Sequence, residues 1–215
     1  MRLSNTIVLA SMNPDKYREF KALLSGYPDI ELLPAEGIIR NPDKIEFAEH
    51  YSTYTENAAA KARLANQASH YPCLADDSGL EIDALEGKPG VRSRRYAKLV
   101  GVPSRINQDR ANIDLVLGEL KKKIDAPRTA RFVTTLALVL EGISVTATGI
   151  LDGTIADSAR GEMGFGYDPI FIPKGFNKTL GEMTQTEKNS ISHRARAIHE
   201  IIAQVRARGI VLAKP

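Results

Sequence analysis

Leu74-Ala-Asp-Asp-Ser-Gly-Leu-Glu-Ile-Asp-Ala-Leu85 is the stretch from which the rest of the chain is best understood. The apolar run Cys73–Ala75 is typical of the end of a buried strand, and it leads into the adjacent carboxylates Asp76 and Asp77. Ser78-Gly79 is expected to break the strand, which places both carboxylates at its carboxyl end. Neighbouring side chains of an extended chain point to opposite faces, so one of the pair faces any given cleft. We expect one carboxylate to serve a metal ion or a water and the other to hold the turn.

The same four residues, Asp76-Asp-Ser-Gly79, also fit a simpler interpretation. Asp and Ser side chains commonly bond nearby backbone in a polar turn that has no further function. Taken alone, the stretch favours the turn, and the neighbouring segments decide between the two interpretations.

A strand, a tight loop and a helix come first in the chain. Thr6–Ala10 is an apolar run of strand length, and Ser11-Met12-Asn13-Pro14-Asp15-Lys16 follows it. Asn13 fits an N-cap and Pro14 the first helical position. A helix start of this kind binds phosphate well, and Lys16 in its first turn is unfavourable unless an anion is bound. An ordinary capped helix is the alternative.

The next predicted elements are a strand near Ile30–Leu33 and an alanine-rich helix. The helix begins with the capping-box pattern Thr53-Tyr-Thr-Glu56 and runs to about Ser69. The helix carries Asn57 and Lys61, and the charged residues Glu56, Lys61 and Arg63 fit a solvated face.

The second half of the chain is richer in β-type runs. We predict a helix over residues 102–124 capped by Ser104, strands over 129–140, 143–150 and 153–156, a glycine-rich loop over 161–169, and a last helix that ends at Gly209. This mixture predicts a single α/β domain, residues 1–215, with a long twisted mixed β-sheet flanked by helices. We expect two lobes with an active-site cleft between them.

Composition sets limits on the function. The chain has 215 residues and a net charge of +3, which suits an anionic small molecule but lacks the basic stripe of a nucleic-acid binder. A single cysteine, Cys73, excludes an intrachain disulfide and fits a reducing compartment. No run has signal-peptide character or transmembrane length. We therefore expect a cytoplasmic protein with neither nucleic acid nor membrane as partner.

Several segments, in order and across nearly the whole chain, resemble the inosine triphosphate pyrophosphatase family, also called the Ham1-like family. The segments are Leu9-Ala-Ser-Met-Asn-Pro-Asp-Lys16, Thr53-Tyr-Thr-Glu-Asn-Ala58 with Lys61-Ala62, Ala75-Asp-Asp-Ser-Gly-Leu80 with Asp83-Ala-Leu85, Pro89-Gly90, Ser93-Arg-Arg-Tyr96, Ala130-Arg-Phe132, Gly164-Phe-Gly-Tyr-Asp-Pro-Ile-Phe171 and Ile191-Ser-His-Arg194. Three positions depart from the family pattern: Met12 and Ala195 stand where glycine is usual, and Arg94 where alanine is usual.

The resemblance implies hydrolysis between the α- and β-phosphates of a nucleoside triphosphate, with Mg²⁺ as cofactor. By position, Asp77 would activate the attacking water and share the metal with Glu49, while Ser78 would touch the nucleotide. The remaining implied substrate contacts are the phosphate-loop residues Ser11, Met12, Asn13, Pro14, Asp15 and Lys16, then Lys188, and the base-pocket residues Phe165, Gly166, Tyr167, Asp168, His193 and Arg194.

The predicted protein is thus a homodimeric housecleaning pyrophosphatase acting on the purine nucleotides ITP, dITP and XTP. One alternative is a related pyrophosphatase that prefers pyrimidine or modified nucleotides. Another is a nucleotide or nucleic-acid binding module without turnover. Glu49, Asp76 and Asp77 argue against the module, because carboxylates at a phosphate site repel the ligand unless a metal is present.

Overall fold

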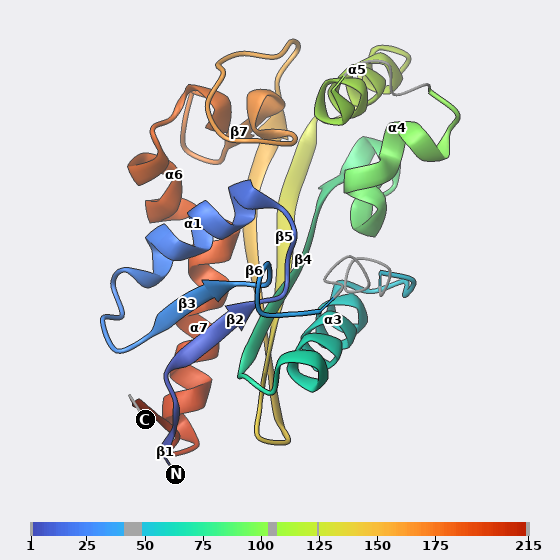
Figure 1. Cartoon of the computed structure of the whole chain (residues 1–215). Helices are drawn as coiled ribbons and strands as arrows, with labels where there is room; N and C mark the ends of the chain where they lie inside the picture. The colour runs from blue at the N-terminus through green and yellow to red at the C-terminus, as the bar shows by residue number, and fades with distance from the viewer. Residues whose placement is uncertain (1, 41–48, 103–106, 124, 214–215) are drawn as a thin grey trace. The chain divides into compact units, whose positions relative to one another are not determined.

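The structure is a computed structural model that describes residues 2–40, 49–102, 107–123 and 125–213. Its strands and helices, in chain order (Figure 1), are β1 (Arg2–Ser4), β2 (Thr6–Leu9), α1 (Pro14–Leu24), β3 (Glu31–Pro34), α3 (Tyr54–Ser69), β4 (Cys73–Ile82), α4 (Tyr96–Leu99), α5 (Gln108–Lys121), β5 (Thr129–Leu140), β6 (Ile143–Ile155), β7 (Phe171–Pro173), α6 (Gln185–Ile191), α7 (His193–Ala207) and β8 (Val211–Ala213).

The strands form a six-stranded sheet in the order β3-β2-β4-β5-β6-β7 and a separate pair, β1 with β8. Strand β2 is parallel to both β3 and β4, whereas β7 is antiparallel to β6, so the predicted mixed sheet is confirmed. The turn between β5 and β6 consists of Glu141 and Gly142, both at positive φ, which matches the twist of a two-residue hairpin.

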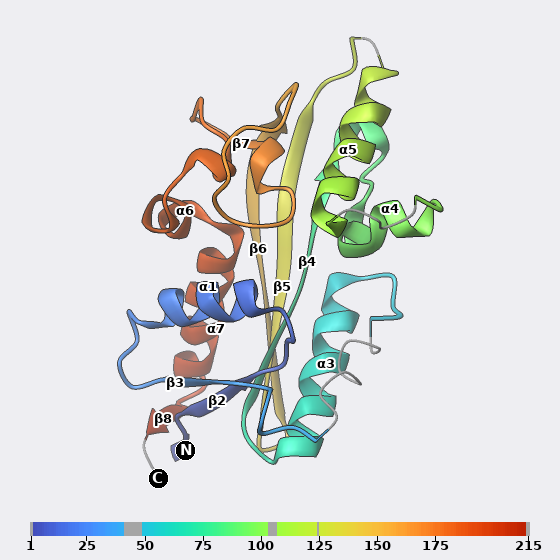
Figure 2. The ribbon, with the colours of Figure 1, turned by 45° about the horizontal axis from the view of Figure 1, so that its top comes forward.

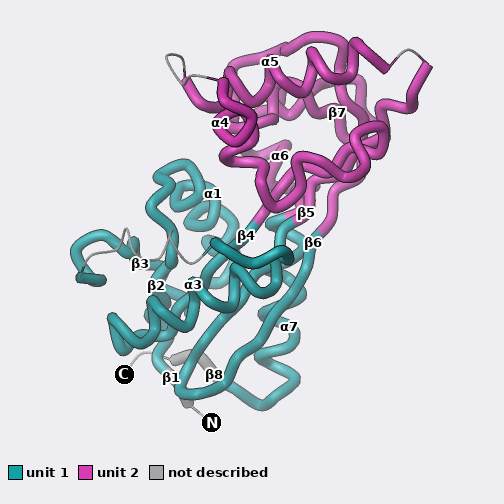
Figure 3. The backbone as a smooth tube through the Cα atoms, turned by 90° about the vertical axis from the view of Figure 1, so that its right-hand side faces the viewer, with its two compact units in different colours: residues 1–77, 134–149, 194–215 teal, residues 78–133, 150–193 magenta. Residues whose placement is uncertain are grey.

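The chain divides into two compact units (Figure 3). Unit 1 contains residues 1–77, 134–149 and 194–215, and unit 2 contains residues 78–133 and 150–193.

Unit 1 is a sheet covered by helices on both faces, with α1 and α7 on one side and α3 on the other (Figures 1 and 2). Strand periodicity produces this arrangement, because alternate residues enter different cores. Ile7, Leu9, Leu74, Leu136 and Leu138 pack with Phe20 of α1 and Ile198 of α7. Their neighbours Val8, Ala10, Cys73, Ala75 and Ala137 pack instead with Ala58 and Ala62 of α3. The alanine face lets α3 approach the sheet closely.

Unit 2 has one principal core. The distal part of β4 contributes Leu80 and Ile82, and α5 contributes Ile113, Val116 and Leu120. Phe132 of β5 and Phe171 of β7 lie against each other in this core, with ring centroids 4.6 Å apart.

Several predicted boundaries differ from those observed. Strand β6 runs unbroken to Ile155, so the predicted interruption between residues 150 and 153 is wrong. Helix α5 begins at Gln108 with Asn107 as its N-cap, and the predicted cap Ser104 lies outside the described residues. The predicted start of α1 and the predicted helix end at Ser69 are confirmed, and the structure also shows a capping box at Thr184–Glu187. In the described part of the chain, no helix is long and apolar enough to cross a membrane.

Candidate active site

Asp76 and Asp77 lie in the middle of β4, and the prediction that the strand ends after them is wrong. The strand continues through Ser78 and Gly79 to Ile82. Between β2 and β5 the segment is a central strand, and neighbouring strands override the local turn preference of Asp-Ser-Gly. The predicted alternation of the two carboxylates is confirmed, because they meet different helices.

Asp76 is fully buried on the side of α1 and α7. Its Oδ1 lies 3.0 Å from Lys16 Nζ, and its Oδ2 lies 3.6 Å from Arg194 Nε. Arg194 also donates to the buried carboxylate of Glu19 at 3.1 Å. Burial alone would raise the pKa of Asp76, but Lys16, Arg194 and Lys61 outweigh it and hold that pKa well below its usual range. Asp76 therefore stays ionised at neutral pH.

Asp77 faces α3 and has the opposite character. Its Oδ2 accepts a hydrogen bond from Asn57 Nδ2 at 3.0 Å, and its Oδ1 lies 3.8 Å from Lys61 Nζ. Burial raises the pKa of Asp77 to about 6, and the nearby Glu49 adds to the rise against the opposing pull of Lys61. A carboxylate with a pKa in this range is well suited to accept a proton near neutral pH.

Lys61 holds the acidic groups together. Its ammonium donates to Glu49 Oε1 at 2.8 Å and to the backbone carbonyl of Asp76. Burial would lower the pKa of Lys61, but Glu49, Asp77 and Asp76 raise it on balance, so the side chain stays charged. The expectation of a solvated face fails here, since Lys61 is buried while Glu56 and Arg63 of the same helix are exposed.

The first turn of α1 is organised as expected for an anion-binding helix start. Asn13 Oδ1 accepts from the N–H groups of Asp15 and Lys16, and Ser11 Oγ accepts from the N–H of Asn13. Met12 packs against the core beneath α3. Burial lowers the pKa of Lys16 despite the attraction of Asp76, so a further anion at this helix start would favour its charged form.

The glycine-rich loop of unit 2 is built around Asp168. The carboxylate of Asp168 accepts from Phe165 N at 2.9 Å and from the buried Lys188 Nζ at 2.7 Å. Glycine is required at position 164 for two reasons. Its φ of +77° lies in the left-handed region that other residues rarely adopt, and a Cβ there would clash with Asp168 Oδ2. Lys188 Nζ also lies 4.8 Å from the centre of the Phe165 ring. The loop thus presents a half-buried aromatic ring backed by a cation.

The other predicted residues of the base pocket are distributed as follows. Gly166 donates its N–H to Asp109, and the hydroxyl of Tyr167 donates to the Ser93 carbonyl at 2.8 Å. His193 is buried and stacks on Phe132, with ring centroids 5.0 Å apart and planes at 10°.

The structure therefore gathers the predicted site residues into two sets. Glu49, Asp76, Asp77, Lys16 and Arg194 share the ion-pair network of unit 1. Unit 2 contains Ser78, Phe165, Gly166, Tyr167, Asp168, Lys188 and His193. Arg194, expected beside His193 at the base, contacts Glu19 and Asp76 in unit 1.

Sequence reasoning missed the roles of Asn57, Lys61 and Glu19 in the unit 1 network. Asn57 and Lys61 are four residues apart, which places them on one face of α3. Lys61 is flanked by alanines that pack toward the sheet, and this was the available signal that its side chain also points inward. Glu19 carried no comparable signal.

The carboxylates of unit 1 suit a hard divalent cation. Among the described residues no group of three or more His, Cys, Asp and Glu side chains is placed to hold a metal. Glu49 and Asp77 nevertheless converge on the same ammonium of Lys61, and their mutual repulsion contributes to the raised pKa of Asp77. Mg²⁺ binds oxygen ligands and keeps several waters, so two protein carboxylates are sufficient.

Buried carboxylates, buried cations and a capped helix start together define a candidate site for a phosphorylated ligand with a divalent cation. The chain belongs to the Ham1 family, whose family model matches residues 7–204.

Similar proteins cover almost the full length. The chain is 44% identical over 204 residues to the dITP/XTP pyrophosphatase of Bacillus subtilis, covering 94% of this chain and 97% of that protein. It is also 44% identical over 196 residues to the dITP/XTP pyrophosphatase of Christiangramia forsetii, covering 91% and 96%. A solved HAM1 protein from Coxiella burnetii superposes with a TM-score of 0.76 at 36% identity, covering 94% of this chain and 98% of that one.

Proposed function

We propose that this protein is a nucleoside triphosphate pyrophosphatase that hydrolyses the non-standard purine nucleotides ITP, dITP and XTP. The products are the nucleoside monophosphate and pyrophosphate, and the role is removal of these nucleotides from the pool. Membership of the Ham1 family and the names of its dITP/XTP pyrophosphatase relatives support this activity. The observation that carries it in this chain is Asp77, a buried carboxylate with a pKa raised to about 6 beside Lys61 and Glu49.

In the proposed reaction, water attacks the α-phosphorus and gives its proton to Asp77. The bond between the α-phosphorus and the bridging oxygen breaks, and pyrophosphate leaves with the electron pair. Asp77 can accept the proton because the pKa of its carboxyl group is raised to about 6, which makes its carboxylate a stronger base. Asp76 stays ionised beside Lys16 and Arg194. The pair thus separates into a base and a fixed anion.

Glu49 and Asp77 would hold the divalent cation, which we propose to be Mg²⁺. When bound, it supplies positive charge that neutralises the phosphates during attack by water. Ser11, Asn13, Lys16 and Lys188 would hold phosphates. Met12, Pro14 and Asp15 would be further substrate contacts at the start of α1, and Ser78 would touch the nucleotide. The N–H groups at a helix start and the Lys16 ammonium are suitable donors for phosphate oxygens.

Lys16→Ala should weaken binding of a triphosphate far more than binding of the monophosphate product. The partly buried ammonium has its pKa lowered by desolvation and gains most from a multiply charged ligand. Calorimetry with a non-hydrolysable triphosphate analogue and with IMP measures the difference. Lys21→Ala is the matched control, because Lys21 is an exposed lysine in the last turn of the same helix. Equal weakening of both ligands would show that Lys16 does not contact the outer phosphates.

The base is assigned to Phe165, Gly166, Tyr167, Asp168, His193 and Arg194. Phe165 would stack on the purine without selecting it, because aromatic faces accept every base. Discrimination between 6-oxopurines and adenine would come from hydrogen-bond donors directed at the 6-oxygen of the base. The N–H groups of Phe165 and Gly166 are already bound to Asp168 and Asp109, so these donors would be the side chains of His193 and Arg194. Recruitment of Arg194 would require release from Glu19 and Asp76.

The test is pyrophosphate release from ITP, dITP, XTP, GTP, ATP and CTP, with and without Mg²⁺. We expect kcat/KM for ITP to exceed that for ATP by up to about 10⁴-fold, because adenine leaves buried donors facing its amino group. Comparable rates on ATP and ITP would reject the base assignment. Preference for CTP would favour the pyrimidine or modified-nucleotide alternative, and binding without release would favour a non-catalytic module.

We further propose that units 1 and 2 act as one catalytic domain, residues 1–215. We propose that the protein is cytoplasmic and a homodimer. Its ligand would be a purine nucleotide, with neither nucleic acid nor membrane as partner. One family model spans residues of both units, which supports the first point. Sedimentation equilibrium of the purified protein measures the oligomeric state.

A further inference from the structure

Asn57 is almost completely buried in the second turn of α3, and its amide bonds two separate parts of unit 1. Its Oδ1 accepts from the N–H of Tyr51 at 3.0 Å, and its Nδ2 donates to the Tyr51 carbonyl at 3.2 Å. The same Nδ2 donates to Asp77 Oδ2 at 3.0 Å. Both amide protons are therefore engaged, one on the segment that carries Glu49 and one on β4.

These bonds determine which way the amide faces. Rotating it by half a turn would direct Oδ1 at the Asp77 carboxylate and at the Tyr51 carbonyl, three acceptors with no proton between them. Asp77 Oδ2 is therefore held on the Asn57 side, and Oδ1 is the oxygen that lies toward Lys61 and hence toward Glu49.

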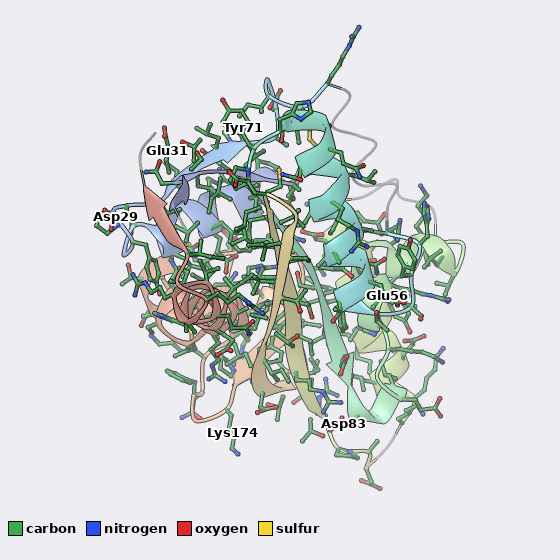
Figure 4. All side chains as sticks on the ribbon, turned by 90° about the horizontal axis from the view of Figure 1, so that it is seen from below. Asp29, Glu31, Glu56, Tyr71, Asp83 and Lys174 are labelled. Atoms are coloured by element: carbon green, nitrogen blue, oxygen red, sulfur yellow. The ribbon has the colours of Figure 1, made fainter. Side chains whose placement is uncertain are left out.

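Asn57 and Lys61 connect the same two segments from one face of α3. Asn57 donates hydrogen bonds to the Tyr51 carbonyl and to Asp77, and one helical turn later Lys61 donates to Glu49 and to the Asp76 carbonyl of β4. Figure 4 shows α3 running between Glu56 in its first turn and Tyr71 just past its end. Tyr51 lies two residues from Glu49, so fixing its backbone also fixes the origin of that side chain.

We propose that Asn57 is a positioning residue for the carboxylate pair: it sets the orientation of Asp77 and the placement of Glu49 toward a divalent cation. The assignment rests on the proposed function. It does not place Asn57 in contact with substrate. Mutation of residues that hold the ligands of a metal commonly lowers metal affinity or activity by about 10- to 100-fold.

The test compares Asn57→Ala and Asn57→Asp with wild type and with Asn66→Ala. Asn66 is a matched control, since it lies on the same helix and its Nδ2 donates to the carbonyl of another tyrosine, Tyr71, away from the carboxylates. Binding of Mn²⁺ to the nucleotide-free protein, followed by electron paramagnetic resonance, is the readout that does not depend on turnover. Steady-state kinetics at saturating Mg²⁺ are the second readout.

We expect Asn57→Ala to weaken Mn²⁺ binding by about 10-fold or more and to lower kcat similarly with little change in the KM for nucleotide. Asn57→Asp keeps the size but sets a carboxylate against Asp77 and the Tyr51 carbonyl, so its kcat should fall further than that of Asn57→Ala. Asn66→Ala should match wild type in both readouts. Unchanged Mn²⁺ affinity and kcat in folded Asn57→Ala would overturn the inference.

If Asn57→Ala does not fold, the wild-type protein still gives an answer. Addition of Mg²⁺ should shift the side-chain ¹⁵N amide signal of Asn57 and leave that of Asn66 in place. An unmoved Asn57 signal in a protein that binds Mg²⁺ would overturn the inference. Failure of the proposed function is distinguishable, because it would appear as absent pyrophosphate release by the wild-type enzyme.

Discussion

Asp77→Asn should lower kcat by at least ~10²-fold, the lower end of the range for removal of a general base, while the protein remains folded. Asparagine has nearly the same shape and can still accept the hydrogen bond from Asn57, but its amide cannot take a proton from water. Pyrophosphate release from ITP at saturating Mg²⁺ measures the loss. Asp157→Asn is the control, since the Asp157 side chain is 97% exposed. Near-full activity of the Asp77 variant would transfer the role of base to another group, with Asp76 the next to test.

The same variant should be more stable than wild type at neutral pH when metal is chelated. Burial raises the pKa of Asp77 from 3.8 to about 6, so the folded state holds this proton more tightly than the unfolded state. The associated stability is present below pH 3.8 and is lost as pH rises through 6, and it amounts to about 3 kcal/mol at about 1.4 kcal/mol per pKa unit. Asparagine does not ionise and escapes this loss.

Urea unfolding at pH 4 and at pH 7.5, both with chelator, measures the effect. The free energy of unfolding of the Asp77→Asn variant, relative to wild type, should increase by about 2–3 kcal/mol between the two conditions. A difference that does not change with pH would mean that Asp77 ionises in the folded protein as easily as it does in water.

Lys61→Met should be the most disruptive of these changes for the folded protein. Methionine fits the space but leaves Glu49, Asp77 and the Asp76 carbonyl without their ammonium. The Lys61 and Glu49 side chains are 5% and 13% exposed, so the ion pair is well shielded from water. Removing one partner of a buried pair costs about 3–5 kcal/mol, and we expect turnover to be lost as well because the two carboxylates repel each other.

Thermal unfolding with and without Mg²⁺ tests this explanation. Because a bound cation would replace the missing charge, Mg²⁺ should stabilise Lys61→Met more than it stabilises wild type. Arg63→Met, on the exposed face of the same helix, should behave like wild type. A Lys61→Met protein with wild-type stability would show that Glu49 and Asp77 do not depend on the ammonium.

Local patterns predicted the starts of α1 and α3 well because capping is a short-range interaction. Asn13 and Thr53 each bond N–H groups within three residues, and the sequence contains everything required. The alternation of Asp76 and Asp77 followed from backbone geometry for the same reason.

The remaining features depend on contacts between distant segments. The end of β4 was misplaced because pairing with neighbouring strands keeps Ser78-Gly79 extended. Lys61 looked like a surface charge because its partners lie 12 or more positions away in sequence, at Glu49 and Asp76. The contact of Arg194 with Glu19 spans 175 positions, and no local pattern foretells it.

The alignment of β4 with β2 has a chemical consequence beyond packing. Val8 is level with Cys73 and Leu9 with Leu74, so the faces to which Asp76 and Asp77 point are already determined two residues earlier. Sliding β4 by one residue would turn each carboxyl group to the opposite face, so that only one of the two sets of surroundings would still contain an aspartate. Two side chains of identical chemistry differ in acidity only because backbone pairing assigns them to different surroundings. A single-residue deletion between Pro72 and Asp76 should therefore abolish proton transfer, because Ser78 would take the place of Asp77, even though every side chain named in the site would still be present.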